Sequence, residues 1–177
     1  MMTTTFNSLN LIFCLNVVLL MISVSTSHSR TFHLNDEKLI ENTCKKTPNY
    51  NVCIQSLKSN PRSFGADVGG LALIMVDVMK AKANEAVSKI RQLQRSGSKP
   101  GLTSCVESYD AILDDDIPEA IFGIQAGMPK FAEQAANDAV IEANSCQDDF
   151  PGPLTIQNKA MSDVASVTSA IVKILLK

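Results

Sequence analysis

The sequence predicts an all-α protein: an up-down-up-down four-helix bundle with an N-terminal α-helical hairpin extension and two disulfides. Three observations favour this fold. Apolar residues recur at three- and four-residue steps along most of the chain, clusters of Gly and Pro separate these segments, and four cysteines follow an apolar N-terminal run. The alternating pattern typical of β-strands is absent from the sequence. Because an amphipathic helix buries one face, four such helices joined by short turns favour a bundle.

Residues 1–27 are predicted to be a secretory signal peptide. They contain the apolar run LNLIFCLNVVLLMISV, and Ser25 and Ser27 are small residues suited to cleavage before His28. The alternative is a transmembrane anchor, but a membrane span needs about 20 predominantly apolar residues, and this run is shorter. We therefore expect a secreted protein with no membrane segment after signal cleavage.

The remaining chain is predicted to have two parts, a helical hairpin in residues 28–60 and the bundle in residues 61–177. It is long enough to form one domain with its own core. The first bundle helix is expected from Val68 to Leu93, where apolar residues fall on one stripe. Gly97 then supplies a C-terminal stop.

The second bundle helix is predicted from an apolar stripe between Leu102 and Ile124. It contains Pro118, which lacks an N–H donor and predicts a kink or a short break after the acidic triplet 114–116. Consecutive helix positions point about 100° apart, and no Gly-bearing loop lets these three carboxylates converge on a cation. The triplet is therefore predicted to be a solvated patch of like charge, and no metal site or cofactor is expected.

The third and fourth bundle helices follow the two remaining Gly and Pro turns. The third begins with Pro129, which is favoured at a first helical position. Most residues of its apolar stripe are small; the stripe consists of Phe131, Ala135, Ala139, Ala143 and Cys146. The fourth follows Pro151-Gly152-Pro153 and carries its stripe from Leu154 to Leu175.

The first predicted disulfide joins Cys105 to Cys146. One cysteine lies near the start of the second bundle helix and the other near the end of the third, with Gly127 near the midpoint between them. An antiparallel hairpin that turns at this glycine brings the two thiols level. Removal of the apolar run, which contains Cys14, leaves an even number of cysteines for an oxidising compartment, where disulfides persist.

The second predicted disulfide joins Cys44 to Cys53 in the N-terminal hairpin. Along a straight helix these residues would be about 13 Å apart, beyond the roughly 4.4–6.8 Å that a disulfide allows between Cα atoms. The chain must therefore reverse between them, and Thr47-Pro48-Asn49 has the composition of a turn. This argument predicts two short helices tied together at their connection.

The residues do not indicate an enzyme or a nucleic-acid-binding protein. The two histidines, His28 and His33, precede the first expected helix, so a Ser–His or Cys–His pair has no base within the fold. Motifs for zinc proteases, serine hydrolases and phosphate-binding loops are missing. The net charge of −2, the absence of Trp and the presence of only two Tyr exclude a basic, base-stacking surface.

Four features together closely resemble the plant invertase/pectin methylesterase inhibitor family. They are the segment ENTCKKTPNYNVC, the helix LALIMVDVMKAKANEA, the Cys105/Cys146 pair and the triplet Pro129-Lys130-Phe131. The resemblance covers residues 38–176, expected to be one inhibitor domain, and is to the cell-wall invertase (β-fructofuranosidase) inhibitors in particular. It implies an enzyme inhibitor that binds cell-wall or vacuolar invertase one to one. It also implies that Pro129, Lys130 and Phe131 enter the substrate site and block sucrose cleavage.

A physical argument supports this role for the triplet. A retaining glycosidase holds two carboxylates about 5 Å apart, and the compact ammonium of Lys130 is suited to a position between them. Pro129 restricts φ and orders the tip before binding, and Phe131 adds apolar area. Without the resemblance, the same residues favour an ordinary helix start: a first-turn proline, a solvated lysine and a core-facing phenylalanine.

Two other functions remain open at this stage. A pectin methylesterase inhibitor would share the bundle but bind through the sides of its helices, so Lys130 would not matter. A non-inhibitory helical binding module would share the fold alone. For any of the three, we expect a monomer when free and secretion to the apoplast or cell wall, with the vacuole as the alternative.

Overall fold

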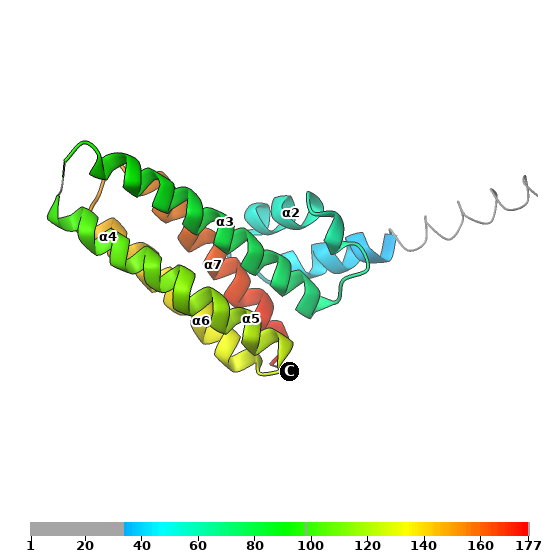
Figure 1. Ribbon diagram of the computed structural model, residues 1–177. Coiled ribbons are helices and arrows are strands. Elements are labelled where there is room, and N and C mark those ends of the chain that lie inside the picture. The colour runs from blue at the N-terminus through cyan, green and yellow to red at the C-terminus, as the bar shows by residue number, and fades with distance from the viewer. Residues whose placement is uncertain (1–33, 98, 177) are drawn as a thin grey trace, which may run out of the picture.

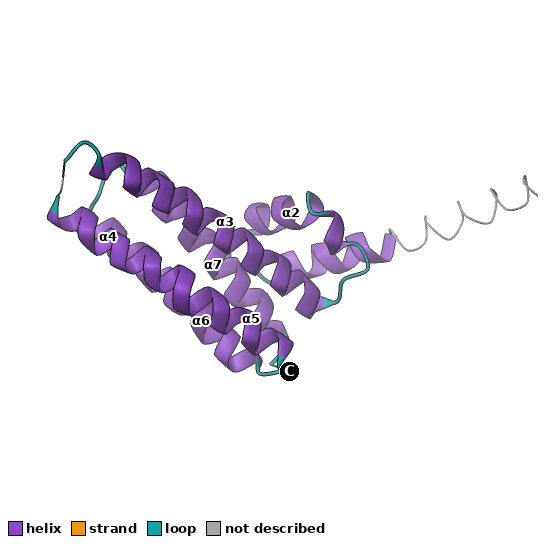
Figure 2. Ribbon diagram, in the orientation of Figure 1, coloured by secondary structure: helices purple, strands orange, loops and turns teal. Residues whose placement is uncertain are grey.

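A computed structural model describes residues 34–97 and 99–176 (Figure 1). The predicted signal peptide, residues 1–27, and both histidines lie outside the described residues. Figure 2 shows that the described part of the chain consists of helices and connecting turns, without a strand. The prediction of an all-α fold is confirmed.

Four long helical segments form the bundle. They are α3 (Val68–Gln94), the consecutive pair α4 (Pro100–Ala111) and α5 (Ile117–Gln125) with a π-helical turn (Ile112–Asp116) between them, α6 (Pro129–Asp149) and α7 (Thr155–Ile174). Each segment packs against the preceding and following one. Helix α7 also packs against α3, so the four segments form a closed bundle. The up-down-up-down topology is therefore confirmed. The α5–α6 turn, the start of α3 and the end of α7 lie at one end of the bundle, and the other two turns lie at the opposite end (Figure 1).

Small side chains on α6 allow close packing in the core. The buried face of α6 consists of Ala132, Ala135, Ala136, Ala139, Ala143 and Cys146. Helix α6 packs against α4, α5 and α7, and α7 supplies larger buried side chains, among them Met161, Val164 and Ile171. Phe131 does not belong to this stripe, contrary to the sequence prediction. It precedes Ala132 by one position, which rotates it about 100° around the helix and out of the core.

Pro118 marks an irregularity, but the second bundle segment does not break. The π-helical turn Ile112–Asp116 lies immediately before α5, and the Ile117 N–H donates to the Ile112 carbonyl five residues earlier. Pro118 is the second residue of α5 and follows directly on this wider turn. The sequence located the disturbance correctly, and a wider π turn precedes the proline where a kink or a short break was expected.

The N-terminal hairpin packs beside the bundle. It consists of a helix over residues 34–44 and α2 (Tyr50–Lys58), followed by a 3₁₀ turn at Pro61–Ser63. The disulfide Cys44–Cys53 joins the two helices, with 5.5 Å between Cα atoms. Helix α2 contacts α3 and α7 and no other bundle helix to a comparable extent.

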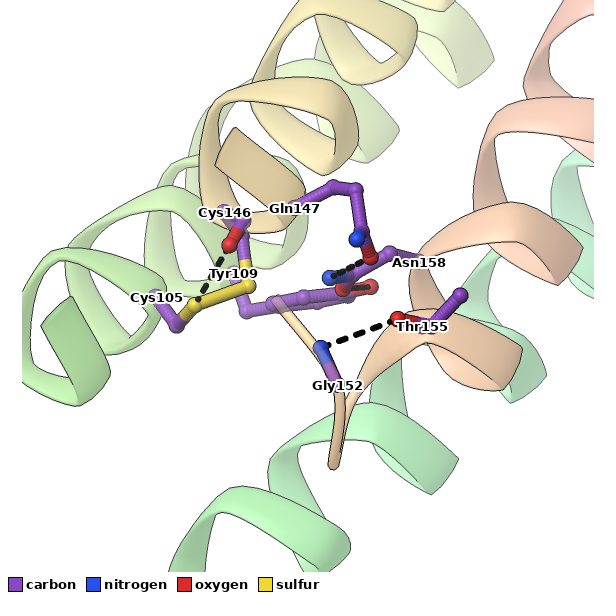
Figure 3. Close-up of a disulfide and its surroundings, with 7 residues drawn as sticks. All are labelled: Cys105, Tyr109, Cys146, Gln147, Gly152, Thr155 and Asn158. Atoms are coloured by element: carbon purple, nitrogen blue, oxygen red, sulfur yellow. Dashed lines mark hydrogen bonds between the residues drawn. A yellow bond between two sulfur atoms is a disulfide. The ribbon is translucent and has the colours of Figure 1, made fainter. Parts of the chain in front are cut away.

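The disulfide Cys105–Cys146 ties the start of α4 to the end of α6, with 4.5 Å between Cα atoms (Figure 3). A buried hydrogen-bond network lies beside it. The Tyr109 hydroxyl donates to Asn158 Oδ1 at 2.9 Å, and Asn158 Nδ2 donates to Gln147 Oε1 at 3.2 Å (Figure 3). Burial raises the pKa of Tyr109 well above its ordinary value, so the phenol stays neutral and remains a donor. Disulfide and network together join α4, α6 and α7 at this end of the bundle.

Candidate functional site

The triplet singled out in the sequence forms the first turn of α6, at the end of the bundle where α5 meets α6. Pro129 is half-buried at the first helical position, and Lys130 and Phe131 are exposed. Residues 127–131 are named the tip below. The structure therefore brings the three predicted residues to one projecting corner of the molecule.

The connection between α5 and α6 is an ordered turn. Gly127 has a φ of +68°, in the left-handed region that favours glycine. The Met128 N–H donates to the Gly123 carbonyl at 2.8 Å, and the Gly127 N–H donates to the Ile124 carbonyl at 3.3 Å. These two bonds form a Schellman motif, which satisfies the last carbonyls of α5 and fixes the direction of the chain into α6.

Directly beneath the tip, α5 and α6 touch through backbone. A Cβ added to Gly123 would lie 2.7 Å from the Ala132 backbone nitrogen and 3.0 Å from the Ala132 Cβ. Both neighbours are rigid parts of α6, so a larger residue would have to separate the helices. This contact was not foreseen, because Gly123 lies inside a helical stripe whose sequence gives no sign of a close approach.

We expect Gly123→Ala to destabilise the protein by about 1–3 kcal/mol, since overpacking a close contact costs that amount. The measurement is denaturant unfolding followed by circular dichroism. Gly69→Ala is the matched control, because Gly69 is also helical but its Cβ would meet atoms at ordinary distances of 3.4 and 3.9 Å. Helix propensity then makes the control neutral or slightly stabilising. Equal stability of both variants and the unsubstituted protein would contradict the close contact.

Lys130 is a cation without a partner in the described part of the chain. The five ion pairs found among residues 34–97 and 99–176 do not include it. The nearest ion pair along α6 joins Glu133, near the start of α6, to Lys173, near the end of α7. Their Oε1 and Nζ atoms are 3.9 Å apart. Lys130 is therefore free to pair with a carboxylate of another molecule.

Asp116 corrects the prediction of a fully solvated acidic triplet. Asp114 and Asp115 are exposed as expected, but Asp116 is only 8% exposed and its Oδ2 has no hydrogen-bond partner among the described residues. Burial, and after it the negative charges of Asp138, Glu142, Asp115 and Glu119, together raise the pKa of Asp116 to about 7. The sequence signal was available: position 116 lies four residues after Ile112 and four before Ala120, both buried.

A polar depression of about 340 Å³ lies between α6 and α7, away from the tip. Two pairs of its side chains are bonded to each other. Asn158 donates to Gln147, and Lys159 pairs with Asp163 at 2.7 Å. Among residues 34–97 and 99–176, His, Cys, Asp and Glu nowhere gather in a group of three able to hold a metal ion. Over the same residues, none of the helices has the length and apolar character to cross a membrane.

Comparison with known proteins assigns the family. Residues 38–173 match the family described as "Plant invertase/pectin methylesterase inhibitor". The chain belongs to this family. The members that it resembles are named as inhibitors of enzymes, which confirms the prediction of an inhibitor and not an enzyme.

The relatives of this inhibitor-family protein include both branches. Over 142 residues it is 42% identical to "Cell wall / vacuolar inhibitor of fructosidase 1" of Arabidopsis thaliana, which covers 78% of this chain and 69% of that protein. Over 146 residues it is 31% identical to "Pectinesterase inhibitor" of Actinidia deliciosa, and the match covers 80% of this chain and 78% of that protein. A crystal structure of a pectin methylesterase inhibitor from Arabidopsis, in mutant form A, has a TM-score of 0.64 at 21% identity over 73% of this chain and 92% of that one. This last likeness shows a shared fold.

Proposed function

We propose that the protein inhibits acid invertase (β-fructofuranosidase) by inserting Pro129, Lys130 and Phe131 into the enzyme's sucrose-binding site. The observation that carries this proposal is the unpaired, exposed ammonium of Lys130 on an ordered, projecting turn. The higher identity to a fructosidase inhibitor than to a pectinesterase inhibitor, 42% against 31%, supports the same target.

The geometry of the tip suits insertion into a site that holds two carboxylates. Invertase is a retaining glycosidase, whose catalytic carboxylates are about 5 Å apart. An ammonium with three donors is able to bond both. Because the Schellman turn and Pro129 order the tip beforehand, little conformational entropy is lost on docking.

We further propose a secreted protein that binds its target one to one as a monomer, in the apoplast or cell wall or in the vacuole. Residues 1–27 would direct export and be removed. The two disulfides support this location, because such bonds persist in oxidising compartments and are rare in the cytosol.

The second candidate is inhibition of pectin methylesterase. The 31% identity to a pectinesterase inhibitor and the shared fold favour it. An inhibitor of this kind would bind through the sides of the bundle helices, and the tip would not be needed. The two candidates therefore differ in what they require of Lys130.

We expect Lys130→Ala to weaken inhibition of invertase by at least about tenfold. Truncation of one partner of a buried, hydrogen-bonded charge pair costs about 2–5 kcal/mol in affinity. The thermal midpoint should stay nearly unchanged, because loss of an exposed side chain changes stability by about 0.5 kcal/mol or less. The measurement is the inhibition constant, from sucrose hydrolysis rates at several sucrose concentrations.

The control is Lys159→Ala. Lys159 lies near the start of α7, at the opposite end of the bundle, and its exposed pair with Asp163 contributes little. Inhibition by the control and by the unsubstituted protein should be competitive with sucrose. Full inhibition by Lys130→Ala, or an inhibition constant independent of sucrose, would show that the tip does not enter the site. Inhibition of pectin methylesterase alone would select the second candidate.

A further inference from the structure

Two phenylalanines face solvent on adjacent helices at the end of the bundle that carries the tip. Phe122 of α5 is 60% exposed and Phe131 of α6 is 52% exposed. Together with Met128 and Glu119 they line an open groove of about 270 Å³. Phe122 belongs to neither the triplet nor any motif in the sequence, and its position was not predicted.

The spacing of the two rings is fixed by the backbone beneath them. Phe122 directly precedes Gly123, and Phe131 directly precedes Ala132, the two residues at which α5 and α6 touch. A rigid contact therefore holds the two aromatic side chains on either side of the groove. Because both rings are largely exposed, neither contributes much to the core of this chain.

The groove has the size and the chemistry for a single protein side chain. Pockets for small molecules typically have volumes of about 300–1,000 Å³ and enclose their ligand, whereas this groove is smaller and open. Its lining is apolar except for one exposed carboxylate, that of Glu119. Lys130 is not part of this lining, but it belongs to the same first turn of α6 as Phe131, so the tip carries both a cation and one wall of the groove.

We propose that the groove between Phe122 and Phe131 is a second contact of the tip with the inhibited enzyme. This contact rests on the function proposed above, and it specifies the chemistry of the enzyme surface that meets the groove. Beside the carboxylates that receive Lys130, the rim of the enzyme's active site presents an apolar side chain that fills the groove. Next to that side chain it presents a basic group that faces Glu119. Charge complementarity sets a basic group of the enzyme against Glu119 and its carboxylates against Lys130, and aromatic side chains in an interface are typical binding hot spots.

The test compares Phe122→Ala with Phe122→Leu in the oxidised, full-length inhibitor. We expect the alanine variant to raise the inhibition constant for invertase at least about tenfold, as loss of an aromatic anchor does. The leucine variant keeps most of the apolar area and should recover the larger part of that loss. Thermal midpoints of both variants should match that of the unsubstituted protein. Glu119→Gln should raise the inhibition constant about two- to fivefold at low salt, and less at high salt.

The control is Ile156→Ala. Ile156 is 79% exposed in the first turn of α7, at the opposite end of the bundle, and its loss should leave inhibition unchanged. If Phe122→Ala inhibits fully while Lys130→Ala does not, the groove proposal is overturned and the insertion of Lys130 stands. If both variants inhibit fully, the proposed function fails as well. A dimer that sediments as a monomer only after Phe122→Ala would assign the groove to a second copy of this chain and overturn the proposal.

Discussion

Replacing both Cys105 and Cys146 by Ser is expected to lower the free energy of unfolding by about 4 kcal/mol. The two residues are separated by 41 positions, and closing a loop of this length restricts the unfolded chain by that amount in the loop-entropy description. Both sites are fully buried, so the two hydroxyls would also lose water on folding. The measurement is urea unfolding of the oxidised protein and the variant, with m-values compared to detect changes in the unfolded state.

The paired replacement of Cys44 and Cys53 is the matched control. These residues are separated by 9 positions, for which the same relation gives about 3 kcal/mol. The hairpin contacts the bundle through α2 on α3 and α7, so its loosening should leave most of the bundle core intact. Equal stability of the Cys105/Cys146 variant and the unsubstituted protein would show that this disulfide is not a principal restraint. A peptide map that joins Cys44 to Cys146 would contradict the fold itself.

The elements that the sequence predicted well are those governed by local periodicity and spacing. The stripe from Val68 to Leu93 predicts α3 to within one residue, and Pro129 marks the first residue of α6. The separation of Cys44 from Cys53 requires a chain reversal, because a helix would hold them too far apart. In each case, the physical constraint acts between residues close in sequence, or through one hairpin.

The features that were missed depend on contacts between helices. Phe131 was placed in the stripe of α6, but the stripe turns with the helix and the close approach to α5 is made by Ala132. The close fit at Gly123 and the exposed ring of Phe122 follow from how α5 and α6 meet, which periodicity does not specify. Asp116 was grouped with its two acidic neighbours by composition, whereas its place on the buried face decides its environment.

Raising the pH from 4 to 7 is expected to destabilise the protein, and Asp116→Asn is expected to remove most of this dependence. The pKa of Asp116 is raised from 3.8 to about 7 in the folded protein. Between these values the folded state keeps the proton and the unfolded state releases it, so the free energy of unfolding falls as the pH rises. The loss is at most about 1.4 kcal/mol per pH unit, or up to about 4 kcal/mol by pH 7. Below the unfolded value both states are protonated, and the contribution is fully present.

The physical cause is a carboxyl that loses water on folding and gains only negative neighbours. Burial raises its pKa most. The charges of Asp138 and Glu142 on α6, and of Asp115 and Glu119 nearby in the chain, raise it as well, and none of the causes found among the described residues lowers it. An amide at position 116 remains neutral at every pH. The variant should therefore match the unsubstituted protein at pH 4 and exceed it in stability at pH 7.

The measurement is urea unfolding of both proteins at half-unit steps from pH 4 to pH 8. Asp115→Asn is the control, because Asp115 is exposed and its removal relieves only one of the four repulsions on Asp116. It should lower the pKa of Asp116 slightly, so that the loss of stability ends at a slightly lower pH and keeps its slope. An NMR titration that finds the Asp116 carboxyl ionising near 3.8, or an unchanged slope in Asp116→Asn, would contradict the assignment. The expected outcome makes the bundle most stable at acidic pH, because there the buried carboxyl at the end of the π-helical turn carries no charge.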